Sequence, residues 1–153
     1  MTQFRKALKN QKGLTLVELL AVIVILGIIA AIAVPAVANI IENSRKDAHV
    51  ANAESLYNAA RLAVVSENLN AETGSEWTFY ADDTETDRDS LNLNLVDERY
   101  LDSGPQDPND SGDYTSAEVS YNGTDYTIIL GGYFTDTGKP ITTIRSEGRD
   151  AVE

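Results

Sequence analysis

The hydrophobic residues divide the chain into an apolar N-terminal part and a largely polar remainder. No residue between Leu19 and Ala38 is charged, and a helix of about 20 residues is roughly 30 Å long, enough to cross a bilayer. One carboxylate, Glu18, directly precedes this run. Four cations lie further upstream, namely Arg5, Lys6, Lys9 and Lys12. The pattern predicts a membrane-spanning helix whose first turn carries an ionisable side chain.

The helical pattern continues beyond this segment but becomes amphipathic. Between Asn39 and Asn68 the apolar positions recur close to the i, i+3, i+4, i+7 spacing of one helix face. They are Val50, Ala53, Leu56, Tyr57, Ala60, Ala63 and Val64. One helix from Leu14 to about Asn68 would be roughly 80 Å long. We expect a kink or a melted turn at Pro35, with Gly27 upstream, and an exposed position for His49 among its charged neighbours.

The middle of the chain is polar and acidic and predicts little regular structure. Residues 72–75 are expected to end the helix, and residues 77–80 to form a short extended piece over the core. Residues 82–87 read as a solvated acidic loop. Residues 91–101 alternate briefly and then predict a short helical turn that serves packing.

The C-terminal third carries the clearest strand signals. Ala117–Tyr121 and Asp125–Phe134 flank Asn122-Gly123, a preferred two-residue type I′ hairpin turn. Gly131-Gly132 is expected to bulge or end the second strand. A turn at residues 137–140 then leads to a third strand over Ile141–Arg145, and residues 146–153 are expected to fray. The sequence therefore predicts an α+β fold in which an antiparallel sheet packs on the C-terminal half of a long helix.

The segment Lys12–Leu20, with the sequence Lys-Gly-Leu-Thr-Leu-Val-Glu-Leu-Leu, resembles the class III leader of type IV pilins and their pseudopilin relatives. The resemblance implies that a prepilin peptidase cuts after Gly13 and methylates the new N-terminus at Leu14, where the family usually has phenylalanine. It also implies that Glu18 and Pro35 are the family's assembly glutamate and helix-loosening proline. The resulting division is a leader at 1–13, a transmembrane and filament-core helix at 14–38, and an amphipathic helix with a globular head at 39–153.

The chemistry of this segment can also be argued from the residues. Cleavage after Gly13 would create an α-amino group at Leu14, four residues before Glu18. On a helix both groups lie on one face, about one turn apart. An amine and a carboxylate that enter an apolar filament core can neutralise each other within one subunit or between neighbours. Glu18 is therefore interpreted as a device that sets the assembly register.

The resemblance implies a structural subunit of a type IV pilus-like filament, shaped like a lollipop. Its implied partners are a prepilin peptidase, a platform membrane protein, an assembly ATPase and further copies of the chain. The precursor would reside in the cell membrane as a single-pass protein and the mature subunit in a cell-surface filament. A pseudopilin of a type II secretion or DNA-uptake machine is the alternative within the family.

Two other interpretations of the N-terminus remain open at this stage. Ala36-Val37-Ala38 offers a small-x-small cleavage site, so residues 1–38 could be an ordinary signal peptide that releases a secreted calcium-binding module. The segment could also be a plain membrane anchor. Against a signal peptide, the apolar core exceeds the typical length of about 7–15 residues and Glu18 lies inside its leading edge.

Composition narrows the functional classes further. The chain carries a net charge of −12 with 12 basic and 24 acidic residues, and removal of the four leader cations leaves 8 basic residues and a charge of −16. Such a charge argues against nucleic-acid binding, which needs cationic patches. There is no cysteine, so a disulfide cannot close a C-terminal loop. Catalysis is rejected, because the sequence offers no Ser/His/Asp set, no phosphate-cradling glycine loop and no cysteine nucleophile.

A calcium loop is a further hypothesis for residues 107–118. Hard oxygen ligands grouped around a glycine turn are what Ca²⁺ requires, and this stretch fits a twelve-residue calcium loop at most ligand positions. The candidate ligands are Asp107, Asn109, Ser111, Asp113 and Glu118. The alternative is an acidic turn in which the Asp, Asn and Ser side chains cap their own backbone. A metal clasp would compensate for the missing disulfide.

Overall fold

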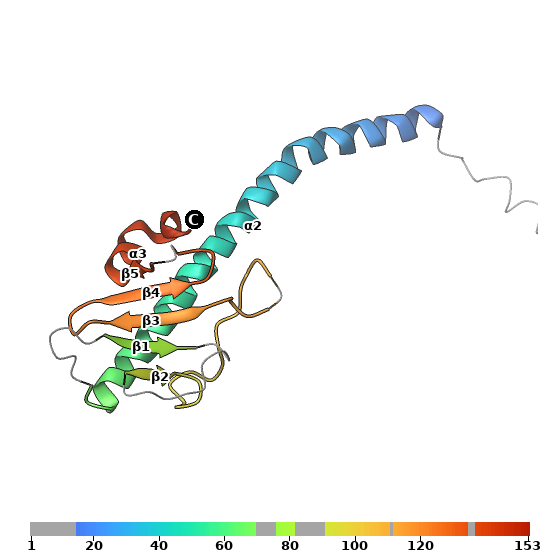
Figure 1. Ribbon diagram of the computed structural model, residues 1–153. Coiled ribbons are helices and arrows are strands. Elements are labelled where there is room, and N and C mark those ends of the chain that lie inside the picture. Colours follow the sequence, from blue (N-terminus) through green and yellow to red (C-terminus); the bar gives the residue numbers. More distant parts are fainter. Residues whose placement is uncertain (1–14, 70–75, 82–90, 111, 135–136) are drawn as a thin grey trace, which may run out of the picture. The chain divides into compact units, whose positions relative to one another are not determined.

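The computed structural model describes residues 15–69, 76–81, 91–110, 112–134 and 137–153. In chain order its elements are helix α2 (Leu16–Ser66), strands β1 (Trp77–Tyr80), β2 (Asn92–Asn94), β3 (Ala117–Tyr121), β4 (Tyr126–Leu130) and β5 (Lys139–Pro140), helix α3 (Ile141–Glu147) and the 3₁₀ helix η2 (Gly148–Ala151) (Figure 1). The chain divides into two compact units, residues 1–41 and 42–153. The prediction of an α+β fold with a long N-terminal helix is confirmed.

Helix α2 is continuous over 51 residues and includes Pro35. Of the two expectations for this proline, the melted turn is wrong, whereas the kink stays a prediction. A proline removes one backbone N–H donor, and the alanine-rich surroundings, which favour helix strongly, keep the flanking turns helical. The helix ends at Ser66, where Asn68 adopts a left-handed conformation with φ 51° and the Leu69 N–H donates to the Val64 carbonyl at 3.0 Å. This is a common way to terminate a helix.

The five strands form one sheet in the order β2-β1-β3-β4-β5. The β1–β3, β3–β4 and β4–β5 pairs are antiparallel, whereas β1 and β2 run parallel, with Phe79 opposite Leu93. The sheet is therefore mixed rather than wholly antiparallel as predicted. The predicted extended piece at residues 77–80 is confirmed as β1, which lies inside the sheet between β2 and β3.

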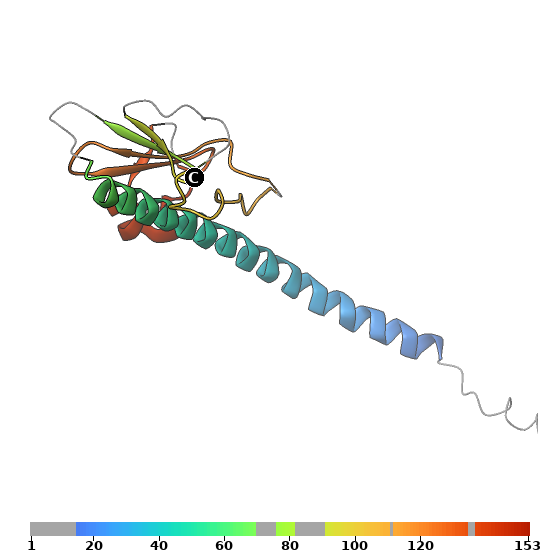
Figure 2. The ribbon, with the colours of Figure 1, turned by 90° about the horizontal axis from the view of Figure 1, so that it is seen from below.

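Within the unit formed by residues 42–153, α2 lies along one face of the sheet (Figure 2). The core side of the helix consists of His49, Ala53, Leu56, Ala60 and Ala63, which are all fully buried. Across the sheet, Phe79, Val119 and Ile128 stand in one row of register and are also fully buried. Since complete burial of one such large apolar side chain contributes about 1.5–3 kcal/mol, this layer is the main source of stability of the head. The predicted apolar stripe of the helix is confirmed.

The β3–β4 hairpin has a longer loop than predicted. Tyr121 pairs with Tyr126, so residues 122–125 form a four-residue connection instead of a two-residue type I′ turn. Asn122 explains the difference, because its Oδ1 accepts the backbone N–H groups of Thr124 (3.0 Å) and Asp125 (2.8 Å). This side chain organises a wider loop, in which Gly123 has φ 93°. The expected strand end at Gly131 is confirmed.

The C-terminal prediction is wrong in two respects. Ile141–Arg145 is not a strand but the greater part of helix α3, and residues 146–153 do not fray but complete α3 and form η2. Ile141 and Ile144 are both buried. Their three-residue spacing places them on one helix face, whereas in a strand they would point to opposite sides of a sheet. Ala151 and Val152 are buried as well, so the end of the chain is part of the core.

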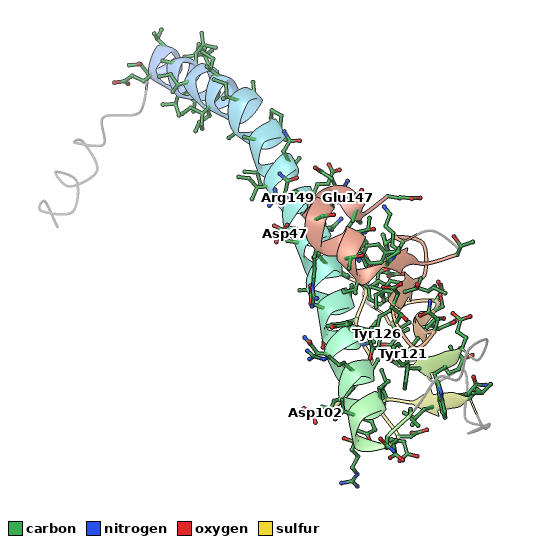
Figure 3. The ribbon with its side chains drawn as sticks, turned by 90° about the vertical axis from the view of Figure 1, so that its left-hand side faces the viewer. Asp47, Asp102, Tyr121, Tyr126, Glu147 and Arg149 are labelled. Atoms are coloured by element: carbon green, nitrogen blue, oxygen red, sulfur yellow. The ribbon has the colours of Figure 1, made fainter. Side chains whose placement is uncertain are left out.

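Two guanidinium–carboxylate pairs fasten this C-terminal segment to α2. Arg145 Nε and Nη2 donate to the two carboxylate oxygens of Glu54, each at 2.7 Å. Arg149 Nε and Nη2 donate to the two oxygens of Asp47 at 3.1 and 2.8 Å, and Figure 3 labels this second pair. We call these contacts the C-terminal clasp. They show how a head without cysteine holds its last residues in place.

Candidate functional site

The start of α2 is organised by a reciprocal pair of side chains, Thr15 and Glu18. The Thr15 hydroxyl accepts the Glu18 backbone N–H at 3.2 Å. Glu18 Oε2 in return accepts the Thr15 backbone N–H and the Thr15 hydroxyl, each at 2.8 Å. This is a capping box, in which two backbone donors without helical partners are satisfied at once. The single carboxylate of the apolar segment thus fixes the first turn of the helix.

The helix that follows exposes its apolar side chains on every face. Large aliphatic residues from Leu16 to Ile41 are 48–82% exposed. None of the 18 most apolar consecutive residues of α2 is buried, and the helix is long and apolar enough to span a membrane. An all-round apolar helix needs a lipid or protein environment. This part of the chain therefore requires surroundings that its own fold does not supply.

Residues 8–34 match the family model described as the prokaryotic N-terminal methylation motif. The matched segment includes the part of the chain that resembles the class III leader and N-terminal segment of type IV pilins and pseudopilins. The expected resemblance is therefore confirmed for the N-terminal segment. No curated protein and no solved structure matches the chain. The leader motif marks a structural rather than a catalytic class of proteins.

The structure places the predicted leader and assembly residues as follows. Lys12, Gly13 and Leu14 lie outside the described residues, so cleavage after Gly13 stays a prediction. Glu18 is the third residue of α2, and Pro35 lies within the same helix. The structure thus gives Glu18 a local partner, Thr15, which the sequence pattern did not reveal, although Thr-x-x-Glu is the sequence signature of a capping box.

The candidate calcium ligands are distributed over a turn and a strand. Asp107 Oδ1 accepts the Asn109 backbone N–H at 2.8 Å, and its Oδ2 accepts the Tyr133 hydroxyl at 2.8 Å. Asp113 forms an isolated β-bridge with Gln106. Glu118 lies in β3, opposite Tyr80 and Ile129, while Ser111 lies outside the described residues. The turn at Asp107 therefore has the self-capping geometry that was the alternative to a metal loop.

Within the described ranges no group of three or more His, Cys, Asp or Glu side chains is arranged to hold a metal ion. The Asn109 side-chain amide is directed to His49 instead, with Nδ2 and Nε2 3.2 Å apart. Calcium binding by residues 107–118 stays a prediction, and any such binding would have to compete with these hydrogen bonds.

His49 is fully buried, and the prediction that it is exposed is wrong. Because the Asn109 amide donates to Nε2, the imidazole carries its proton on Nδ1 and donates to the Tyr114 hydroxyl, 2.7 Å away. The ring also stacks on Tyr133 with a centroid distance of 3.8 Å. Burial lowers the pKa of His49, while the nearby Asp107 carboxylate acts in the opposite direction. The signal that could have located it is its position four residues before Ala53, on the buried face.

The hydroxyl of Tyr114 links this cluster to a second residue of α2. Asn52 Nδ2 donates to the Tyr114 hydroxyl and to the Gln106 carbonyl, both at 2.9 Å. Burial raises the pKa of Tyr114 to about 12. The loop before β3 is therefore attached to the helix by neutral hydrogen bonds, at the end of a segment that the sequence predicted to be polar and acidic.

Proposed function

We propose that this chain is the precursor of a structural subunit of a type IV pilus-like filament. A prepilin peptidase cuts it after Gly13 and methylates Leu14, and the mature chain then polymerises through residues 14–38. The single observation that carries the proposal is the match of residues 8–34 to the N-terminal methylation motif, located on a helix that buries none of its most apolar window.

The exposed apolar half of α2 supports a subunit that resides first in the membrane and then in the filament. Before assembly, lipid surrounds these side chains, since residues 19–38 carry no charge and are long enough to span a bilayer. After assembly, the same residues of neighbouring subunits replace the lipid. The four leader cations would oppose that transfer, because burying a charge without a partner is costly. Residues 1–13 must therefore be removed before the subunit can assemble.

Glu18 has a defined task in this sequence of events. Among the described residues, its Oε1 atom has no hydrogen-bond partner, whereas its Oε2 atom is held by Thr15. Cleavage would create a new α-amine on Leu14, two residues before the first residue of α2. The free carboxylate oxygen would then neutralise this amine or that of a neighbouring subunit, and the cap would hold the carboxylate in position.

The head would face solvent and supply the surface of the filament. With a charge of −16 after removal of the leader, subunits repel each other at low ionic strength. The partners that this function requires are the peptidase, a platform protein, an assembly ATPase and further copies of the chain. Within the same class, a pseudopilin of a secretion or DNA-uptake machine would use the same processing and the same helix.

The competing release of a soluble module after Ala38 finds less support. Ala38 lies in the interior of the continuous helix α2, and the match to the methylation motif at residues 8–34 supports processing upstream of it. A cut at this point would divide a helix that runs without interruption into the head.

The N-terminus and intact mass of the protein recovered from its own cells test the proposal. We expect a chain that starts at Leu14 and is heavier than its sequence by one methyl substitution. A start at Asn39 would overturn the proposal in favour of a secreted module. A start at Met1 in cells that contain an active prepilin peptidase would mean that residues 1–38 serve only as a membrane anchor.

A further inference from the structure

The sequence contains two Asn-x-Ser/Thr triplets, Asn109-Asp110-Ser111 and Asn122-Gly123-Thr124. Such triplets accept N-linked sugars when they reach an extracytoplasmic compartment and their amide is accessible. The two triplets lie in different surroundings, which allows the structure to distinguish between them.

Asn122 lies in the loop between β3 and β4. All four loop residues, 122–125, are exposed. Oδ1 of Asn122 accepts the Thr124 and Asp125 N–H groups, which leaves Nδ2 without a hydrogen-bond partner among the described residues. The Tyr121 hydroxyl donates to the Gly123 carbonyl at 2.9 Å and further fixes the loop. The amide nitrogen that would be modified is therefore available on an ordered, solvent-facing loop.

The side-chain amide nitrogen of Asn109, in contrast, has a hydrogen-bond partner. Its Nδ2 atom lies 3.2 Å from His49 Nε2, and its backbone N–H is bound by Asp107. Modification of Nδ2 would break the contact that closes the cluster around the buried His49. Asn109 is itself exposed, but this hydrogen bond makes its side-chain amide the less available acceptor in the folded head, so the triplet serves as an internal control for the other.

We propose that Asn122 is an N-glycosylation site. An oligosaccharyltransferase would transfer a glycan from a lipid-diphosphate-linked oligosaccharide to Nδ2. A bond forms between the first sugar carbon and Nδ2, the bond from that carbon to the diphosphate oxygen breaks, and Nδ2 gives up one proton to a base. The lipid diphosphate leaves. The reaction is a group transfer without net oxidation or reduction, and Thr124 supplies the hydroxyl that such transferases recognise.

This inference rests on the proposed function in one respect, since the head must cross the membrane to meet the lipid-linked donor. A glycan on this loop would add bulk and neutral, hydrated surface at the end of the β3–β4 hairpin. We expect it to leave the core unaffected, because Asn122 is exposed and lies outside the paired residues Tyr121 and Tyr126.

The experiment is mass spectrometry of the full chain purified from its own cells, with electron-transfer fragmentation to locate the modified residue. We expect extra mass on Asn122 and none on Asn109. Thr124→Ala should abolish the extra mass while the circular dichroism spectrum stays unchanged, because only an exposed side chain is altered. Thr124→Ser should retain it, and Asn109→Gln should leave the extra mass on Asn122 in place.

Unmodified Asn122 in the wild-type chain would overturn the proposal, as would extra mass that persists on residue 122 in Thr124→Ala. The N-terminal peptide from the same digestion reports on leader processing independently. A chain that starts at Leu14 with an unmodified Asn122 would refute the glycan and leave the filament proposal intact. A glycan on Asn122 of a chain that starts at another residue would support the glycosylation site and refute the filament proposal.

Discussion

Thr15 and Glu18 hold each other in the first turn of α2, where one carboxylate oxygen of Glu18 accepts both the backbone N–H and the hydroxyl of Thr15 at 2.8 Å. The carboxylate that would set the assembly register is thus also a capping group. Its two possible roles can be separated, because Thr15 takes part in the cap only.

We expect Glu18→Ala to leave membrane insertion and cleavage after Gly13 unchanged but to abolish filaments, since no carboxylate remains to neutralise the new amine. Thr15→Ala is the matched control. It weakens the cap but keeps the carboxylate, so filaments should persist in reduced number. Electron microscopy and immunoblots of sheared surface fractions measure both. Normal filaments from Glu18→Ala would refute the role assigned to this residue.

The core of the head can be tested with two leucines of the same helix. Leu56 is fully buried, whereas Leu62 is 54% exposed. We expect Leu56→Ala to lower the free energy of unfolding by about 2–5 kcal/mol and Leu62→Ala to change it by less than about 0.5 kcal/mol. Denaturant unfolding of the detergent-solubilised chain provides the measurement. Equal effects would mean that α2 does not pack on the sheet as described.

The C-terminal clasp predicts a modest, salt-sensitive coupling between Arg145 and Glu54. Both side chains are partly exposed, at 46% and 31%, so solvent screens the pair. We expect a double-mutant cycle with Arg145→Gln and Glu54→Gln to give a coupling of about 0.5–1 kcal/mol, which decreases at high salt. Arg45→Gln is the control, because Arg45 is exposed and lies on α2, the helix that carries Glu54. A coupling of zero at low salt would contradict the clasp.

The same pair predicts an acid dependence. Hydrogen bonds from Arg145 lower the pKa of Glu54 below its ordinary value of 4.5. A carboxyl whose pKa is lower in the folded state stabilises the protein above the unfolded pKa, and this contribution is lost as the pH falls through the folded value. The acid-induced loss of stability below pH 4.5 should therefore be smaller in Glu54→Gln than in the wild type. An equal loss of stability below pH 4.5 in Glu54→Gln and in the wild type would argue against the pair of Arg145 and Glu54.

His49 predicts a second pH dependence at higher pH. Its pKa is lowered by burial from the ordinary 6.5, so the unfolded state binds a proton at a pH at which the folded state does not. Stability is then fully present above pH 6.5 and decreases as the pH falls below this value. His49 is the only histidine, which allows direct assignment by NMR of the ring protons. A measured pKa of 6.5 or higher would contradict the buried, neutral imidazole.

The calcium hypothesis has its own test. If residues 107–118 bind Ca²⁺, the metal at a hundredfold excess over its dissociation constant should stabilise the head by about 2.7 kcal/mol, and Asp107→Asn should remove the effect. Thermal unfolding of the full chain with calcium and with chelator measures this. Equal midpoints would retire the hypothesis and leave the hydrogen bonds of Asp107 to Asn109 and Tyr133 as the reason for the turn.

Local patterns predicted those parts of the fold in which neighbours in sequence decide the structure. The buried stripe on α2 followed from periodicity, the β3–β4 pairing from two strand segments that flank Asn122-Gly123, and the leader motif from a short, specific run of residues. Ile141–Arg145 was predicted as a strand, the state that its β-branched residues favour. The segment is a helix instead, because a helix buries both Ile141 and Ile144 on one face, which is a tertiary effect.

Long-range partners could not be predicted in this way. Arg145 and Glu54 are 91 residues apart, and Arg149 and Asp47 are 102 residues apart, so no local pattern links them. The same holds for the parallel pairing of β1 with β2 and for Asn109 beside His49. In the candidate assembly site, by contrast, the partners Thr15 and Glu18 are only three residues apart, and the Thr-x-x-Glu spacing contained the necessary information.

The clasp also constrains when the head can reach its final form. Arg145, Arg149 and Val152 complete contacts with residues of α2 that leave the ribosome about a hundred residues earlier. Because contacts of such long sequence separation form late, the chain stays incompletely folded while it is synthesised. If the head crosses the membrane, as the proposed function requires, it would do so as an open chain, and its last turn would close on the far side.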